Sequence, residues 1–316
     1  MNLSEFLGKK YLIIIVIAVA IYSTFLFFSD FNTVYDKLQN FQITLLPLIL
    51  VIIFSSWLVL FVRWMILLKK YRIDIPLKIN FLIFFAGFTL AISPAKSGEL
   101  IKSVLLKNKC DLAITKTIPI VLLERFYDII GTTIVAMIGI TFLGLELGAV
   151  LIIAPILIFL IFFLFYSNKS FNFTLKILKR IKPLKKFSNN IEESHLLIRQ
   201  SSDLKTIFSC SGLTIIFRII EAIGILFVLY ALGINFIEYL NMLSIYSASV
   251  ILGSLSMSPG GLGVTEGSFA GLLTLYELEL QTTLAIAVIV RFFTMWFAII
   301  VGFISLKLTQ YVKNTN

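Results

Sequence analysis

Apolar runs make up most of this chain, and several of them are long enough to cross a lipid bilayer. A membrane-spanning helix needs about twenty predominantly apolar residues. Six runs of about this length lead us to predict full spans at residues 11–29, 44–68, 117–143, 149–167, 206–232 and 282–306. Because lipid cannot satisfy backbone polar groups, such runs fold as helices. The sequence therefore predicts an all-α polytopic membrane protein, with residues 1–316 forming a single transmembrane domain.

Two further apolar segments, 79–110 and 241–277, are interrupted by proline and glycine. The interruptions read SPAKSGE (93–99) and SPGGLGVTE (258–266). Backbone outside a helix is tolerated at membrane depth only where protein or a water-filled cavity covers it. The part of the first segment before Pro94 is too short, and the part after it too rich in lysine, for two full spans. We therefore predict a re-entrant pair of half-helices, a broken-helix hairpin, in each segment.

The two interruptions occupy equivalent places in the two halves of the chain, about 44–143 and 206–306. Pro94 lies 31 residues before Arg125, and Pro259 lies 32 residues before Arg291. Each half reads span, broken segment, span. Repeats of this kind in opposite orientation, with broken helices meeting near the bilayer midplane, are an architecture of secondary transporters.

The distribution of basic residues predicts the orientation. If the amino end is cytoplasmic, 21 Lys and Arg residues lie on the inner side and Lys37 lies outside, as the positive-inside rule requires. Both termini are then cytoplasmic, and the first interruption enters from inside while the second enters from outside. The basic loop 168–205 is cytoplasmic, either lying on the anionic inner leaflet or acting as a solvated linker.

Three arginines, Arg125, Arg218 and Arg291, fall near the middle of predicted spans. A charge exposed at that depth costs on the order of 3 kcal/mol, so these groups are expected to face a cavity or one another. Helical spacing allows Arg125 to pair with Asp128, and Arg218 with the glutamate three residues after it. Arg63 lies near the inner end of its span and is expected to snorkel to the interface.

These charges and the interruptions define a candidate substrate site. We expect it to contain Lys96, Glu99, Glu124, Arg125, Asp128, Arg218, Glu221, Gly260, Gly261, Gly263, Glu266 and Arg291. Glu99 and Glu266 either cap the half-helices or bind a proton, a cation or a cationic head group. Lys96 either contacts a phosphate or pairs with Glu99. The set holds four positive and five negative side chains, so its net charge does not select a substrate.

The sequence also contains a regular glycine repeat, and it lacks the common catalytic motifs. Gly263, Gly267 and Gly271 recur every four residues, which favours a helix-packing face. The chain has a single histidine and no H-E-x-x-H, G-x-S-x-G or P-loop motif. We therefore expect no metal, no cofactor and no nucleic-acid partner, and we find no recognisable catalytic motif. Carboxylate-based transfer in the membrane stays open.

Three motifs, SPAKSGELIKSVLL, ERFYD and SPGGLGVTEGSFAGLL, resemble signature stretches of the lysylphosphatidylglycerol synthase transmembrane family, also described as flippase-like. The resemblance extends from about residue 10 to 306. The family's first motif often carries arginines at positions that look like Lys96 and Lys102 here, so charge is kept but bidentate phosphate geometry is lost.

In bifunctional members, the resemblance implies, this region moves an aminoacylated lipid across the bilayer while a separate domain makes it. The chain ends soon after its last span, so we expect a stand-alone lipid translocase in the cytoplasmic membrane, acting on a phospholipid, an aminoacyl-phospholipid or a polyprenyl-phosphate lipid. The alternatives are a transferase acting on a lipid carrier with Glu99 or Glu266 as base, and a subunit that supports a lipid synthase or glycosyltransferase.

Overall fold

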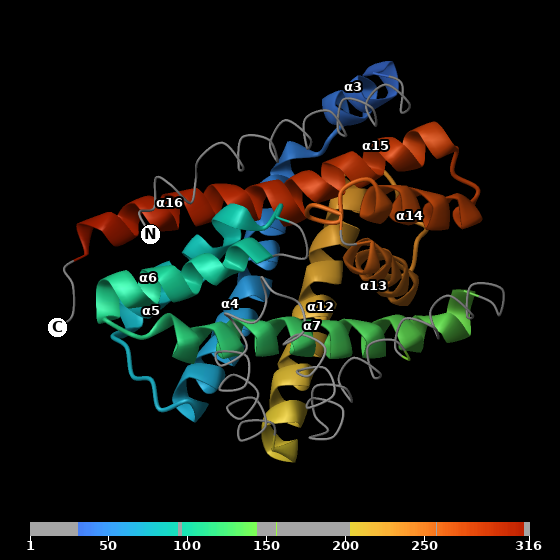
Figure 1. Ribbon diagram of the computed structural model, residues 1–316. Coiled ribbons are helices and arrows are strands. Elements are labelled where there is room, and N and C mark those ends of the chain that lie inside the picture. The colour runs from blue at the N-terminus through green and yellow to red at the C-terminus, as the bar shows by residue number, and fades with distance from the viewer. Residues whose placement is uncertain (1–30, 94–96, 144–155, 157–202, 257, 313–316) are drawn as a thin grey trace, which may run out of the picture.

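The computed structural model describes residues 31–93, 97–143, 156, 203–256 and 258–312 (Figure 1). All regular elements in these ranges are helices, which confirms the predicted all-α class. The predicted spans at 11–29 and 149–167 lie outside the described residues, apart from position 156, and so does most of the basic loop.

The first half of the described chain runs through two long helices with two short ones between them. Its elements are α3 (Phe31–Gln39), η1 (Ile43–Leu45), α4 (Leu46–Lys70), α5 (Leu77–Ala86), η2 (Gly87–Leu90), η3 (Ser97–Leu100), α6 (Ile101–Cys110) and α7 (Ile114–Leu143). Residues 91–99, which include the SPAKSGE motif, separate the two short helices and are called the first break.

The second half repeats this order of long, short, short and long. Its elements are α12 (Leu204–Ala231), α13 (Tyr239–Leu255), α14 (Val264–Leu273), η4 (Thr274–Tyr276), α15 (Leu280–Arg291), η5 (Phe292–Trp296) and α16 (Phe297–Tyr311). The five residues of η5 form a π-helical turn, so α15 and α16 make one continuous rod (Figure 1). Residues 258–266 separate α13 from most of α14 and are called the second break.

Three of these helical stretches are long and apolar enough to cross a membrane. They are Ile43–Lys70, Leu204–Ala231 and Leu280–Tyr311, which agree with three of the predicted spans. A fourth predicted span corresponds to α7, which has 30 residues and carries three charged side chains in its middle. Which side of a membrane each loop faces stays a prediction.

The helices α4 and α12 pack against each other in opposite directions. At one end the backbone N–H of Gln42 donates to the carbonyl of Ala231 at 2.9 Å. At the other end Lys70 pairs with Asp203 at 2.7 Å, and this hydrogen bond lowers the pKa of the exposed Asp203 carboxyl to about 2. The start of α4 thus lies at the end of α12, and the end of α4 lies at the start of α12. These first long helices of the two halves are therefore antiparallel.

The remaining helices make reciprocal contacts between the halves. The last long helix of the first half, α7, packs along α13, and α16 packs along α5 and η2. Gly302 on α16 allows the second contact, since a Cβ there would lie 2.4 Å from the backbone nitrogen of Thr89. Each half thus covers the short helix that precedes the other half's break.

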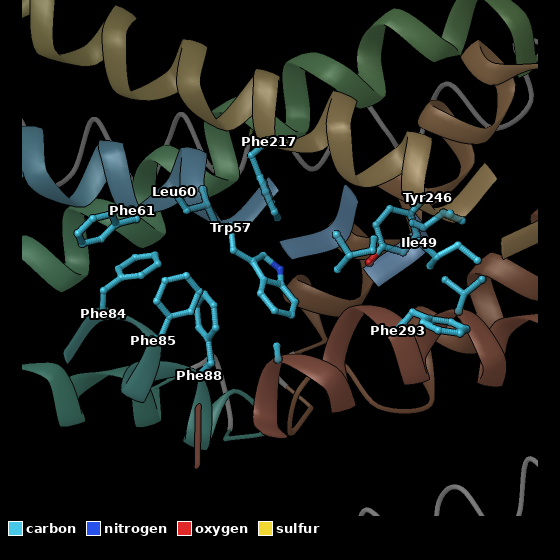
Figure 2. Close-up of a cluster of buried hydrophobic side chains, with 14 of the residues drawn as sticks. Ile49, Trp57, Leu60, Phe61, Phe84, Phe85, Phe88, Phe217, Tyr246 and Phe293 are labelled. Carbon is cyan, nitrogen blue, oxygen red and sulfur yellow. The ribbon is translucent and has the colours of Figure 1, made fainter. Parts of the chain in front are cut away.

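A cluster of aromatic side chains holds the first break in place (Figure 2). Trp57 on α4 lies 5.5 Å from Phe88 and 5.0 Å from Phe297, measured between ring centroids. Phe84 and Phe85 pack on Phe88 from the preceding turn. Because lipid is as apolar as these rings, close packing rather than escape from water drives such contacts inside a membrane. The cluster fixes η2, and with it the start of the first break, against α4 and α16.

Each break has a local reason for its conformation. In the first, the Ser93 hydroxyl donates to the Leu90 carbonyl and accepts from the Gly98 N–H at 2.5 Å. In the second, Gly260, Gly261 and Gly263 have φ values of 62°, 71° and 83°. Glycine adopts this left-handed region at low cost, whereas a Cβ would be strained there. Glycine at these three positions therefore lets the chain turn out of α13 and start α14.

The predicted packing role of the glycine stripe is wrong for two of its three members. A Cβ built on Gly267 or Gly271 meets no atom within 4 Å among the described residues. Both face outward from α14, and the contact of α14 with α13 uses Thr265 instead, against Gly253. The four-residue spacing identified a shared helix face but not the direction in which that face points.

Candidate functional site

A cavity of about 250 Å³ lies between the two breaks and the long helices of both halves. It contains eight of the twelve predicted site residues: Glu99, Arg125, Asp128, Arg218, Glu221, Gly260, Gly261 and Arg291. Three of the other four, Glu124, Gly263 and Glu266, are not part of its lining, and Lys96 lies outside the described residues. The three mid-span arginines thus share one cavity, as the cost of burying them separately predicted.

The rest of the cavity wall is largely apolar. Trp57 and Leu60 from α4, Phe88 from η2 and Phe217 from α12 supply much of this surface. Hydroxyl groups of Thr132, Tyr246 and Thr294 interrupt it. The π-turn η5 follows directly after Arg291 and contributes Thr294 and Met295 to the wall.

The two breaks meet at this cavity. A Cβ on Gly260 would lie 3.1 Å from Cα of Ile92 and 3.4 Å from the Met295 sulfur. Ile92 and Leu262 also belong to one small buried cluster with Met295 and Ile299. Residues from the first break therefore pack directly on residues from the second, although some 170 positions separate them in the chain.

Six charged side chains beside the cavity form a closed ring in which cations and carboxylates alternate. Arg125 binds Glu99 at 2.6 Å and Asp128 at 2.8 Å. Arg63 binds Asp128 at 2.5 Å and approaches Glu124 to 4.0 Å. Lys102 closes the ring by binding Glu124 and, at 3.2 Å, Glu99. Each charge in this six-charge ring thus contacts two charges of opposite sign.

The ring depends on side chains from four elements. Glu124 and Asp128 are four residues apart on α7 and therefore share one face of that helix. Glu99 and Lys102 are three residues apart where η3 passes into α6, and Arg63 comes from α4. Arg63, Glu124 and Lys102 are at most 1% exposed. A buried charge without a partner would be strongly destabilising, so the pairing is a condition for folding.

Two separate ion pairs complete the charged lining in the second half. Arg218 binds Glu221 at 2.5 Å, the predicted i,i+3 pair, and its Nε donates to the Thr132 hydroxyl at 2.9 Å. Arg291 binds Glu266 at 2.6 Å and donates to the Gly260 carbonyl. Arg291 therefore holds both the carbonyl and the carboxylate that flank the turn of the second break.

The pairs Glu99–Arg125 and Glu266–Arg291 are equivalent in the two halves. Each joins the carboxylate at the end of a break to an arginine on the last long helix of the same half, 26 residues later in the first half and 25 later in the second. The similar spacing from Pro94 to Arg125 and from Pro259 to Arg291 indicated this equivalence, but not that each arginine binds its own glutamate.

Glu266 has the predicted capping role and, in addition, an ionic partner on α15. One carboxylate oxygen accepts from the backbone N–H of Gly263 at 2.8 Å and so caps α14. The other oxygen accepts from Arg291. Glu99 sits in the turn before α6, where its carboxylate binds Arg125 and Lys102.

The prediction that Arg63 snorkels to the interface is wrong. Its side chain is fully buried and also donates to the Thr214 hydroxyl at 2.6 Å. Lys102, assigned to the cytoplasmic surface by the charge count, is 1% exposed in the six-charge ring. The sequence did indicate that a cation was missing from the predicted set, because that set had one more carboxylate than cations. The described network has five of each, with Arg63 and Lys102 included.

Comparison with known proteins identifies relatives over most of the chain. The UPF0104 membrane protein MJ1078 of Methanocaldococcus jannaschii is 25% identical over 239 residues, covering 71% of this chain and 94% of the relative. The UPF0104 membrane protein PH1989 of Pyrococcus horikoshii is 22% identical over 321 residues, covering 93% and 95%.

A family profile gives a consistent result. Residues 15–302, which include both breaks and every residue of the cavity, match the profile described as the lysylphosphatidylglycerol synthase TM region. The resemblance carried by the three motifs is thereby confirmed. This multi-pass membrane protein belongs to the lysylphosphatidylglycerol synthase TM region family.

Proposed function

We propose that this protein is a lipid translocase that moves a polar head group across the cytoplasmic membrane through the cavity between the two breaks. The observation that carries the proposal is the meeting of the breaks at one cavity lined by paired, buried charges. Charged side chains at membrane depth mark substrate or ion pathways, because burying them costs free energy and an apolar side chain would serve folding better.

The arrangement of the two halves supports this proposal. An inverted repeat needs equivalent helices that run in opposite directions, and α4 and α12 are antiparallel. It also needs reciprocal contacts, which α7 with α13 and α16 with α5 provide. Transporters built in this way expose a central site to each side alternately by moving one half against the other.

The size and lining of the cavity favour a lipid head group over a whole lipid. Its volume of about 250 Å³ is below the roughly 300–1,000 Å³ of pockets that enclose drug-sized molecules. The head group would enter the cavity while the acyl chains remain in the bilayer. Lys96, Arg125 and Arg291 would contact it, and the apolar wall formed by Trp57 and Phe217 would accommodate its glycerol carbons.

Catalysis by Glu99 or Glu266 is the second candidate, and the geometry favours it less. A general base has to be free to accept a proton from the substrate. Glu99 is held by two cations, and Glu266 is held by Arg291 and a backbone N–H. Each carboxylate is thus already held by donors before any substrate binds. A third candidate is a subunit that supports a synthase without moving lipid itself.

Reconstitution separates the three candidates. The full-length protein is placed in vesicles that contain a fluorescent phosphatidylglycerol, an aminoacyl-phosphatidylglycerol or a polyprenyl phosphate, and a membrane-impermeant quencher reports the leaflet of each lipid. Exchange between leaflets supports the translocase. A covalent lipid product supports the transferase, and neither result with all three lipids supports the subunit.

Alanine variants test the site. Glu266→Ala and Arg125→Ala are expected to abolish exchange, because each removes one partner of a pair that ties a break to the cavity. Lys70→Ala, which removes an exposed pair at the end of α4, is the control and is expected to exchange lipid at the normal rate. Gel filtration and thermal melting confirm folding. Normal exchange by the two cavity variants would show that the site is assigned wrongly.

A further inference from the structure

The carboxylates around the cavity differ in how many cations hold them. In the six-charge ring, Glu99, Glu124 and Asp128 each contact two cations. If one cation of the ring turns toward a ligand, each affected carboxylate keeps the other. The ring can therefore stay connected while the cavity fills and empties.

The pair Arg218–Glu221 is built differently. Among the described residues Arg218 is the cation that contacts Glu221, at 2.5 Å. Its other partners are neutral: the hydroxyl of Thr132 and the ring face of Phe217. Both side chains line the cavity and are about 5% exposed. A ligand that takes Arg218 would leave Glu221 as a buried carboxylate without its cation, a state that proteins avoid by neutralising the group.

Arg291 is less available to a ligand than Arg218. It donates to the Gly260 carbonyl as well as to Glu266, so withdrawing it would release the second break. Arg125 is held by two carboxylates of the six-charge ring. Arg125 and Arg291 can thus contact a head group while they keep these partners. Arg218 is more easily released, because its one ionic bond among the described residues is to a glutamate three positions away on the same helix.

The charge balance of the cavity then sets a condition on any anionic ligand. The described network holds five cations and five carboxylates, so its formal charges sum to zero before a ligand binds. An anionic phosphodiester adds one negative charge to this buried set. We propose that Arg218 binds the phosphate of an anionic lipid head group and that Glu221 takes up one proton as it is displaced, so that each anionic lipid moves together with a proton.

The step balances in charge and atoms. Before binding, Arg218 and Glu221 form a neutral pair and the phosphodiester is a monoanion. Afterwards Arg218 pairs with the phosphate, and Glu221 is a neutral carboxylic acid that carries a proton from water. No bond of the lipid is made or broken. Release on the other side of the membrane restores the pair and returns the proton there, so a proton gradient would drive the lipid. This inference rests on the proposed translocation.

The groups around Glu221 permit such a change. Arg218 lies on the same helix, and α13 contributes Tyr246, which is within electrostatic range of Glu221, Arg218 and Arg291. From α7 come Arg125, Asp128 and Thr132, all at the cavity wall. From α4, Arg63 bonds Thr214 and the six-charge ring, and Lys70 pairs with Asp203 at the far end of the helix.

The test counts protons during binding to the full-length protein in a non-ionic detergent. Dihexanoylphosphatidylglycerol, a monomeric anionic lipid, is titrated calorimetrically at pH 7 in two buffers with different ionisation enthalpies. We expect uptake of about one proton per lipid and an affinity that falls up to about tenfold per unit rise in pH, because the bound state holds the extra proton. Glu221→Gln is expected to bind the lipid without taking up a proton.

Three arms make the result specific. Dihexanoylphosphatidylcholine, whose phosphate carries its own cation, adds no net charge and is expected to bind without proton uptake. The exposed variant Glu279→Gln is expected to take up the same proton as the unaltered protein. Inorganic phosphate is expected to bind at least tenfold more weakly than the anionic lipid, because it cannot use the apolar wall.

Several outcomes would overturn the inference. They are absence of binding by the anionic lipid, binding without proton uptake, uptake that persists in Glu221→Gln, and equal affinity for inorganic phosphate. The proton count in the unaltered protein needs no variant, so poor folding of Glu221→Gln does not remove the test. Leaflet exchange without proton uptake refutes this inference alone. Proton-linked binding without leaflet exchange refutes the translocase and leaves the binding step intact.

Discussion

Arg63 shows how a single buried cation can hold several parts of this protein together. Its guanidinium contacts Asp128 and Glu124 on α7 and Thr214 on α12 while belonging to α4. Removing one partner of a buried ion pair is far more costly than the pair's net contribution, because the remaining charge stays in a medium that solvates it poorly. In the six-charge ring the second cation on each carboxylate limits, but does not abolish, that cost.

We expect Arg63→Met to lower the free energy of unfolding by about 3–5 kcal/mol, because Asp128 and Glu124 each lose a cation in a buried site. Thermal melting in detergent gives the comparison. Lys70→Met is the matched control, since it removes a cation from an exposed pair at the end of the same helix, and its effect is expected to be small. Equal melting temperatures for the two variants would contradict the structural role of the ring.

At the scale of elements, two glycines on different helices of the second half have contrasting surroundings. Gly302 on α16 lies against backbone atoms of Phe88 and Thr89, where η2 leads into the first break. Gly267 on α14 has open space around it among the described residues. The same residue type therefore permits close helix packing at one place and carries no packing at the other.

Replacing each of these glycines by alanine separates the two situations. Alanine favours a helix over glycine by about 0.5–1 kcal/mol, so Gly267→Ala is expected to stabilise the protein slightly. Gly302→Ala gains the same term but places its Cβ 2.4 Å from the Thr89 nitrogen, so α16 has to move away from η2. We expect it to lose stability and to change lipid exchange. Urea or thermal unfolding measures the difference, and a stable Gly302→Ala protein would argue against the close approach.

The whole molecule is organised by the antiparallel pair α4 and α12, around which each half covers the other half's broken segment. A cavity at the meeting point of two such segments belongs to neither half alone. Relative motion of the halves would therefore change its access, whereas motion within one half would break the ring or a pair.

Cysteine labelling tests the orientation of this pair. In a background without Cys110 and Cys210, exposed cysteines at Gln39 and Asn235 are expected to react with an impermeant thiol reagent from outside the cell. Cysteines at Lys69 and Lys205 are expected to react only after the cells are opened. Labelling of the cysteines at positions 69 and 205 from opposite sides of the membrane would refute the antiparallel arrangement. A reversed labelling side for all four cysteines would refute the predicted orientation.

Much of this protein could be predicted because the length of an apolar run, the position of proline and glycine, and the spacing of charges along a helix are local properties of the sequence. Apolar runs of span length determined the helices in 44–68, 206–232 and 282–306. Proline and glycine determined the breaks, because they remove a helical hydrogen bond or permit a positive φ. The i,i+3 pairs of Arg125 with Asp128 and of Arg218 with Glu221 followed from helix geometry.

Tertiary structure alone decided which charges meet across helices. The positions of Arg63 and Lys102 in the chain suggest the membrane surface, and only the packing of α4, α6 and α7 brings them into a closed ring. The outward direction of Gly267 also depends on neighbours that are distant in sequence. Spacing along one helix specifies which residues share a face, but the partner of that face is set by contacts between elements. For this reason the sequence alone determined the buried charges that need partners, and the fold alone determined which partners they have.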